Sequence, residues 1–186
     1  MDLTKITNRD MIGAFLTEHF PNGLGVEVGC LNGVNARNMV STWNCRLMYL
    51  VDTWGTHIPE LYRERTDWTN FLECKRECEI LAKDYPGRVK LHQGKSLDCV
   101  GVYPDESFEF IYLDGAHDYH SVIADCVAWW PKLKKGGLLG MHDANYNDTV
   151  WPAYNEVKRA IESWMPFMSL EPHITHECSS AWVEKK

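Results

Sequence analysis

Residues 110–122, FIYLDGAHDYHSV, pass directly from an apolar run into a group of carboxylates and imidazoles. Asp114 and His117 follow that run, and His142 and Asp143 follow a second apolar run, LLGM, farther along the chain. Polar residues also end strands without any function, so each position alone says little. Together, the side chains of Asp114, His142 and Asp143 form a ligand set that predicts a divalent cation site. The imidazole departs from the all-oxygen set that Mg²⁺ prefers, and it favours Mn²⁺, Fe²⁺ or Zn²⁺.

A second candidate site lies earlier in the chain, where VEVGCLNGVNA describes a strand, a glycine turn and the start of a helix. Backbone N–H groups at such a helix start can face a polar or anionic ligand. The spacing Gly29-x-x-x-Gly33, with Leu31 between the glycines, departs from the G-x-G-x-x-G fingerprint of dinucleotide sites. Asp52 ends the next strand, where an acidic residue accepts hydrogen bonds from ribose hydroxyls in nicotinamide and S-adenosylmethionine sites alike. The pattern therefore predicts a nucleoside site without specifying the nucleoside.

The elements that must position these residues alternate between helices and strands. Helical spacing of apolar residues predicts helices over residues 11–20, 34–43, 67–85, 119–130 and 151–164. Apolar runs predict strands over residues 24–30, 46–52, 89–94, 108–114 and 138–143, with two short candidates at 167–172 and 180–184. Near-continuous apolar strands separated by helices are typical of a mostly parallel α/β sheet covered on both faces. In such sheets the ligand binds outside the carboxyl ends of the strands, where the candidate residues lie.

Composition indicates one globular domain, spanning residues 1–186, that binds a small molecule. The chain is 45% hydrophobic, long enough for a substantial core and too short for two domains of typical size. Its formal net charge is −7, and no cluster of Lys or Arg marks a nucleic-acid or anionic-membrane surface. We therefore expect a small-molecule partner, and neither nucleic acid nor a membrane. A homo-oligomer is compatible with the sequence.

The N-terminal sequence MDLTKITNRD has none of the features of a signal peptide, so we expect a cytoplasmic protein. The seven cysteines lack the paired spacing of known cysteine motifs. Cys74 and Cys78 share a helical stripe with Leu81 and Tyr85, which favours reduced core thiols over disulfides or a metal cluster.

The segments VEVGCLNG, LVDTWGTH, QGKSLD, FIYLDGAHDYHSVIADCVAWWPKLKKGGLLGMHD and VKRAIESW follow one another along the chain. In this order they resemble the class I S-adenosylmethionine-dependent methyltransferases, in particular the small-molecule O-methyltransferase group that includes macrocin O-methyltransferase. The resemblance covers nearly the whole chain after residue 20, and the segment from Phe110 to Asp143 is its most specific part. It implies a Rossmann-like three-layer sandwich with a mostly parallel seven-stranded sheet and an antiparallel C-terminal strand.

The resemblance also implies roles for individual residues at the cofactor. Glu27, Gly29 and Gly33 look like the turn that holds the methionine part of S-adenosylmethionine, Asp52 like the ribose ligand, and Ser96 like an adenine contact. Trp54 either packs on the adenosine or forms a wall of the core, because aromatic residues are common in both places. Asp114 is expected to contact the cofactor as well as to take part in catalysis.

In metal-dependent relatives, and in the more distant catechol O-methyltransferase, an acid at the position of Asp114 and a pair at those of His142 and Asp143 hold magnesium. His117 lies three residues past Asp114. At the similar position, the catechol enzyme has a lysine that acts as the base. An imidazole titrates near neutral pH, so we expect His117 to be the general base. Ala116 departs from related sequences, which often carry a second aspartate there, and this leaves fewer alternatives for proton removal.

These observations predict an enzyme that transfers a methyl group from S-adenosylmethionine to a hydroxyl of a small molecule, such as a sugar or a phenol. A divalent metal, Mg²⁺, Mn²⁺ or Fe²⁺, would assist. Two alternatives remain, a nicotinamide-dependent oxidoreductase and a non-catalytic nucleoside-binding module. For the oxidoreductase, the GCLNG turn leaves little room for a dinucleotide. The long polar connection from about residue 55 to residue 66 is predicted to form a lid over the ligands.

Overall fold

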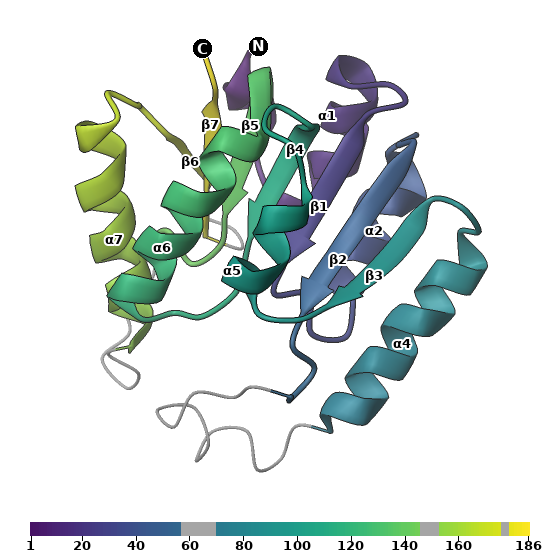
Figure 1. Ribbon diagram of the computed structural model, residues 1–186. Helices are drawn as coiled ribbons and strands as arrows, with labels where there is room; N and C mark the ends of the chain where they lie inside the picture. Colours follow the sequence, from purple (N-terminus) through teal and green to yellow (C-terminus); the bar gives the residue numbers. More distant parts are fainter. Residues whose placement is uncertain (57–69, 146–152, 176–178) are drawn as a thin grey trace.

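The computed structural model describes residues 1–56, 70–145, 153–175 and 179–186 (Figure 1). These residues form a seven-stranded sheet with the strand order β3-β2-β1-β4-β5-β7-β6. The strands are β1 (Leu24–Val28), β2 (Leu47–Asp52), β3 (Val89–Gln93), β4 (Phe108–Leu113), β5 (Leu133–Met141), β6 (His173–Thr175) and β7 (Ser180–Glu184). Pairing is parallel from β3 through β5, whereas β7 is antiparallel to both β5 and β6. The predicted mostly parallel sheet with an antiparallel C-terminal strand is confirmed.

Helices cover both faces of the sheet. They are α1 (Ile12–His19), α2 (Val34–Thr42), α4 (Phe71–Asp84), α5 (Ser96–Cys99), α6 (Tyr119–Trp129) and α7 (Ala153–Phe167), with short 3-10 helices at Leu3–Lys5, Arg9–Met11, Val100–Val102 and Trp130–Lys132. Buried residues of α1, α2 and α4 share one core cluster with one face of the sheet, and those of α5, α6 and α7 share a second cluster with the other. Figure 1 shows α5 and α6 in front of the sheet and α2 behind it. The predicted three-layer sandwich is confirmed.

Local capping explains where two of the helices begin. The Asp118 side chain accepts a hydrogen bond from the Ser121 N–H, 3.0 Å away, so Asp118 caps α6. Asn70 caps α4 in the same way. The predicted start of α4 at residue 67 lies outside the described residues, as does most of the predicted lid, which falls within 57–69.

Strand β5 begins at Leu133, well before the predicted start at residue 138. Phe108 pairs with Leu133 whereas Phe110 pairs with Leu138, so the register shifts and the intervening residues form a bulge. Gly136 has a φ of +75° in this bulge, a backbone conformation that glycine adopts without strain. The KKGG segment, residues 134–137, is therefore part of the strand.

The strand predicted at residues 167–172 is wrong. Phe167 ends α7, and the N–H groups of Met168 and Leu170 donate to the carbonyls of Trp164 and Met165 at its last turn. Ser169 has a φ of +57°, a left-handed conformation typical of helix C-termini. Because these N–H groups complete the helix, they are not free to pair in a sheet, and the strand β6 begins only at His173.

Six cysteines in the described part of the chain are free thiols, five of them buried and Cys74 half-buried. In the same ranges, no helix has both the length and the apolar character that spanning a bilayer requires.

The central strand β4 provides a direct test of this architecture. Ile111 is fully buried in β4, which pairs with β1 on one side and β5 on the other. We expect Ile111→Asp to lower the free energy of unfolding by about 3–5 kcal/mol or to prevent folding, because it buries an unpaired charge. The matched control is Val127→Asp on α6, where the side chain is 59% exposed. Equal denaturant midpoints for the two variants would contradict the placement of β4.

Candidate active site

Parallel pairing brings four chain segments together at the carboxyl edge of the sheet. Val28 pairs with Val51 and with Leu113, and Leu113 pairs with Met141, so β1, β2, β4 and β5 end at the same level. Backbone hydrogen bonds continue this register by one residue, from Asp114 N to Val28 O at 2.8 Å and from His142 N to Leu113 O at 3.0 Å. The residues that follow these strands are therefore neighbours in space, as predicted.

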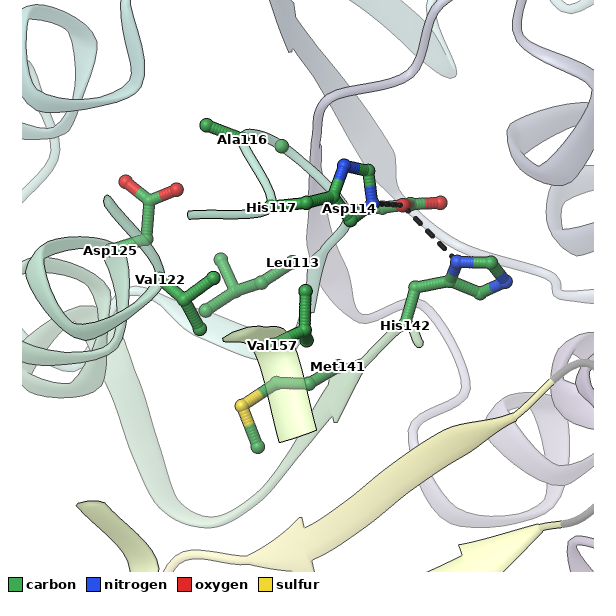
Figure 2. A pocket seen from close by; sticks show the side chains of 10 residues that line it. Leu113, Asp114, Ala116, His117, Val122, Asp125, Met141, His142 and Val157 are labelled. Carbon is green, nitrogen blue, oxygen red and sulfur yellow. Dashed lines mark ion pairs between the residues drawn. The ribbon is translucent and has the colours of Figure 1, made fainter. Parts of the chain in front are cut away.

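Two carboxylates and two imidazoles meet at the ends of β4 and β5. The His142 Nδ1 atom lies 3.3 Å from Asp114 Oδ1 and 3.0 Å from Asp143 Oδ1. The His117 Nε2 atom lies 3.0 Å from Asp143 Oδ2 and 3.7 Å from Asp114 Oδ1. Figure 2 shows both imidazoles directed at the Asp114 carboxylate. We call Asp114, His117, His142 and Asp143 the edge cluster.

Backbone geometry at Asp143 contributes to this arrangement. Asp143 is 5% exposed and has a φ of +55°, which is uncommon for a residue other than glycine. Strained backbone of this kind is found where the surrounding structure holds a side chain in a fixed direction. Here the carboxylate contacts both imidazoles of the edge cluster.

The charges in the edge cluster shift one another's protonation. Burial alone would lower the pKa of both imidazoles, but hydrogen bonds with Asp114 and Asp143 outweigh it and raise the pKa to about 9 for His117 and about 10 for His142. Burial alone would raise the pKa of both carboxyls, but hydrogen bonds from the imidazoles lower it for Asp114 and Asp143. At neutral pH the cluster therefore holds two positive and two negative charges.

The edge cluster offers ligand atoms for a divalent cation. One ligand atom from each of Asp114, His117 and His142 lies within 4.8 Å of the others. The sequence predicted Asp114, His142 and Asp143 instead, so the structure adds His117 as a candidate ligand. Its position shortly after Asp114, on the same loop, was the only signal of this in the sequence.

The glycine turn after β1 is built for close packing. Gly29 has a φ of +82°, and a Cβ atom there would lie 2.0 Å from the Asp114 carbonyl oxygen. Gly33 has a φ of +75° and precedes the first residue of α2. A side chain at Gly29 would therefore displace the start of the Asp114 loop, which explains the glycine at this position.

Asp52 holds the glycine turn in place. Its Oδ2 accepts a hydrogen bond from Leu31 N and its Oδ1 accepts one from Trp54 N, both at 2.8 Å. Burial raises the pKa of the Asp52 carboxyl, although these backbone hydrogen bonds act in the opposite direction. Trp54 is 3% exposed, packs within the core and donates from Nε1 to Leu31 O. Trp54 thus belongs to the core cluster beside the glycine turn, and its contact with the adenosine stays a prediction.

Glu27 lies under the glycine turn, and one of its two carboxylate oxygens has no donor among the described residues. It is 1% exposed, and its Oε1 accepts a hydrogen bond from Asn35 Nδ2 at 2.6 Å. Neither Glu27 Oε2 nor Asn35 Oδ1 has a hydrogen-bond partner among the described residues. Burial raises the pKa of Glu27 to about 8. Asn35 was missed from the sequence, where nothing distinguishes it from other polar residues near a helix start.

Ser96, the predicted adenine contact, belongs to a second group of polar residues. Its hydroxyl donates to Asp125 Oδ1 and accepts from Trp129 Nε1 at 2.8 Å. Burial raises the pKa of Asp125 to about 6. Asp125 was also missed, although it is the one acidic residue on the buried stripe of α6 that Val122 and Trp129 define.

A small cavity, open to solvent, lies between the two groups of polar residues. Its lining includes Asp114, His117 and His142 of the edge cluster, and Asp125 on α6. Figure 2 shows the Asp125 carboxylate at the opposite end of this cavity from His142.

Comparisons with known proteins agree with this fold. The sequence matches no curated protein. Similar solved structures include a putative caffeoyl-CoA O-methyltransferase from Staphylococcus aureus, with a TM-score of 0.69 and 14% identity over 96% of this chain and 82% of that chain. An SAH complex of an O-methyltransferase from Bacillus cereus has a TM-score of 0.60 and 13% identity, covering 95% of this chain and 80% of that one. An SAH-bound methyltransferase from Podospora anserina has a TM-score of 0.65 and 15% identity, covering 96% and 78%.

At such identities, structural likeness shows a shared fold. The sequence itself is more specific, because residues 26–144 match the family described as a methyltransferase domain. This match includes the glycine turn, Asp52 and the whole edge cluster, and it covers more than half of the chain. The chain therefore belongs to the methyltransferase domain family.

Proposed function

We propose that this protein transfers a methyl group from S-adenosylmethionine to a hydroxyl of a small molecule, of sugar or phenol type. The observation that carries the proposal is the edge cluster, which lies beside the glycine turn at one edge of a methyltransferase fold. Two similar structures contain SAH, the product that this cofactor leaves after methyl transfer. The closer resemblance to the macrocin O-methyltransferase group and the small-molecule acceptor belong to the same proposal.

Buried acceptors under the glycine turn fit the methionine end of this cofactor. Glu27 Oε2 and Asn35 Oδ1 lack donors among the described residues, and a buried acceptor without a donor is unfavourable. An ammonium group supplies several donors and a positive charge, which suits a buried carboxylate. Asp52 ends β2 and can receive the ribose, because each of its oxygens keeps a lone pair beyond its hydrogen bond to the backbone.

S-adenosylmethionine supplies the methyl group as a sulfonium, and transfer is an in-line displacement in which the acceptor oxygen loses its proton. Alignment of the two reacting atoms can supply about 7–11 kcal/mol. Asp114 lies against Gly29 and beside His117, so it is placed to contact both cofactor and acceptor. His117 in its neutral form can accept the proton. The carboxylates of Asp114 and Asp143 raise its pKa, so its use as a base depends on a compensating positive charge beside them.

A divalent cation would fit that requirement. Asp114, His142 and Asp143 would hold it, and it would lower the pKa of the acceptor hydroxyl. Two carboxylates with an imidazole favour Mn²⁺ or Fe²⁺ over Mg²⁺, which prefers oxygen ligands alone.

Ligand titration tests the cofactor directly. We expect calorimetry to detect binding of S-adenosylmethionine and SAH and to detect no comparable binding of NAD. Asp52→Ala should weaken SAH binding by about 1–3 kcal/mol, because the ribose loses a charged acceptor. The control is Asp84→Ala, an exposed aspartate that pairs with Arg37. Tight binding of NAD alone would favour the oxidoreductase alternative, and an unchanged SAH affinity would remove Asp52 from the site.

Metal removal tests the edge cluster. Chelation should abolish methyl transfer to a panel of phenols and sugars while SAH binding stays largely intact, and Mn²⁺ should restore activity at least as well as Mg²⁺. His117→Ala should reduce the rate by about 10²–10⁴-fold, the usual contribution of a general base, and leave Mn²⁺ affinity unchanged. Loss of Mn²⁺ affinity in that variant would instead make His117 a ligand. Full activity after exhaustive chelation would contradict the metal.

The protonation of the edge cluster makes stability depend on pH. Because His117 and His142 bind protons more tightly when folded, their stabilisation is present below about pH 6.5 and is lost as pH rises toward about 10. The lowered pKa values of Asp114 and Asp143 give the opposite dependence in acid, where their stabilisation is lost as pH falls below about 4.

We expect the free energy of unfolding in chelator-containing buffer to fall by at least about 2 kcal/mol between pH 6 and pH 9.5. His142→Gln should reduce this difference, whereas His120→Gln, at an exposed position on α6 outside the cluster, should retain it. Urea titrations at the two pH values measure both variants. The same pH difference in His142→Gln and wild type would contradict the assigned protonation.

A further inference from the structure

A buried hydrogen-bonded chain connects α6 to α5 at the end of the cavity that is remote from His142. Trp129 Nε1 donates to Ser96 Oγ at 2.8 Å, and Ser96 Oγ donates to Asp125 Oδ1. The direction of the chain is fixed, because an indole N–H can only donate and the serine hydrogen must then point to the carboxylate. Asp125 is 7% exposed, so this chain holds a charged acceptor in a nearly buried position.

The second oxygen of Asp125 is open to a ligand. Asp125 Oδ2 accepts no hydrogen bond among the described residues, whereas the residue lines the cavity shared with the edge cluster. The residue above it is Gly115, and a Cβ atom there would lie 3.3 Å from Oδ2. Because Gly115 has no Cβ atom, it leaves this oxygen uncovered on the side where the strand β4 ends. The Asp125 side chain is nearly buried and one of its oxygens lacks a donor among the described residues, so a ligand that donates would complete its hydrogen bonding.

The position of Asp125 suggests which part of a ligand it meets. The ribose site at Asp52 ends β2, and β3, the neighbour of β2, leads through Gly94 into Ser96 at the start of α5. A base attached to that ribose would extend toward α5, with Asp125 on the α6 side. Of the common purine bases, adenine carries a donating 6-amino group, whereas hypoxanthine carries an accepting 6-oxo group.

We infer that Asp125 Oδ2 accepts a hydrogen bond from the 6-amino group of the cofactor's adenine, and that Ser96 and Trp129 hold the carboxylate in place for this contact. The inference rests on the proposed function, since it presumes an adenosine at the carboxyl edge. It makes Asp125 a specificity-determining residue, because a carboxylate can only accept and so repels a 6-oxo group. The pKa of about 6 leaves the carboxyl ionised at neutral pH, as this contact requires.

The test compares two ligands that differ in the 6-amino group. SAH carries this group, and its deaminated analogue carries a 6-oxo group in its place, together with a proton on N1. At pH 7.5 the wild-type protein should bind SAH about 10–100-fold more tightly than the analogue, as expected for one hydrogen bond to a charged acceptor. A ratio near one in the wild-type protein would overturn the inference without any substitution.

Variants then assign the selectivity to this residue. Asp125→Asn should lower the ratio of the two affinities to about one or below, because the amide can donate to the 6-oxo group. Asp98→Asn, at an exposed position on the neighbouring helix α5, is the control and should keep the wild-type ratio. An unchanged ratio in a folded Asp125→Asn protein would overturn the inference.

Gly115→Ala provides a second variant if Asp125→Asn does not fold. Its methyl group would cover Oδ2. Any general steric effect weakens both ligands equally, so the ratio should still fall, and an unchanged ratio would overturn the inference. If the wild-type protein binds neither ligand, the proposed function itself fails. If it binds SAH and the ratio does not depend on Asp125, only the assignment of Asp125 fails.

Discussion

Parallel pairing of β4 with β1 on one side and β5 on the other is the constraint on which the site depends. Because Val28, Leu113 and Met141 lie in register, the next residues of three strands meet at one level of the sheet. Gly29 must then lie against the Asp114 carbonyl, and His142 must lie beside the Asp114 side chain. A shift of this register by one residue would turn the side chains that follow each strand to the opposite face and would separate the edge cluster.

The edge cluster is stable in this position because its charges balance. Two carboxylates so close together at the sheet edge would repel one another and raise each other's pKa, but the imidazoles of His117 and His142 reverse both effects. The same balance fits the proposed cation, since a divalent ion would take over the neutralisation that two bound protons otherwise provide. Among the described residues Glu27 has no imidazole beside it, and burial raises its pKa, which fits the proposed position of the cofactor's amino group.

Much of this site could be predicted from the sequence, and the remainder depends on geometry that sequence patterns do not encode. Asp114 and His142 follow apolar runs that read as buried parallel strands, so their convergence follows from the fold class. The contact between His117 and Asp143 depends on the left-handed backbone conformation of Asp143, which the residue type does not predict. Asp125 resembles any polar residue in a helix until α5 is placed beside it. The false strand at residues 167–172 arose because apolar residues there complete the last turn of α7 rather than pair in the sheet.

We propose that the edge cluster and the glycine turn form one site for an adenosyl cofactor and a divalent cation. A crystal structure of the protein grown with SAH and Mn²⁺, with anomalous data collected at the manganese edge, would show both ligands. We expect one strong anomalous peak within bonding distance of Asp114 and His142, and SAH with its ribose at Asp52 and its amino group at Glu27. SAH at the carboxyl edge without an anomalous peak at the cluster, or manganese bound elsewhere, would contradict it.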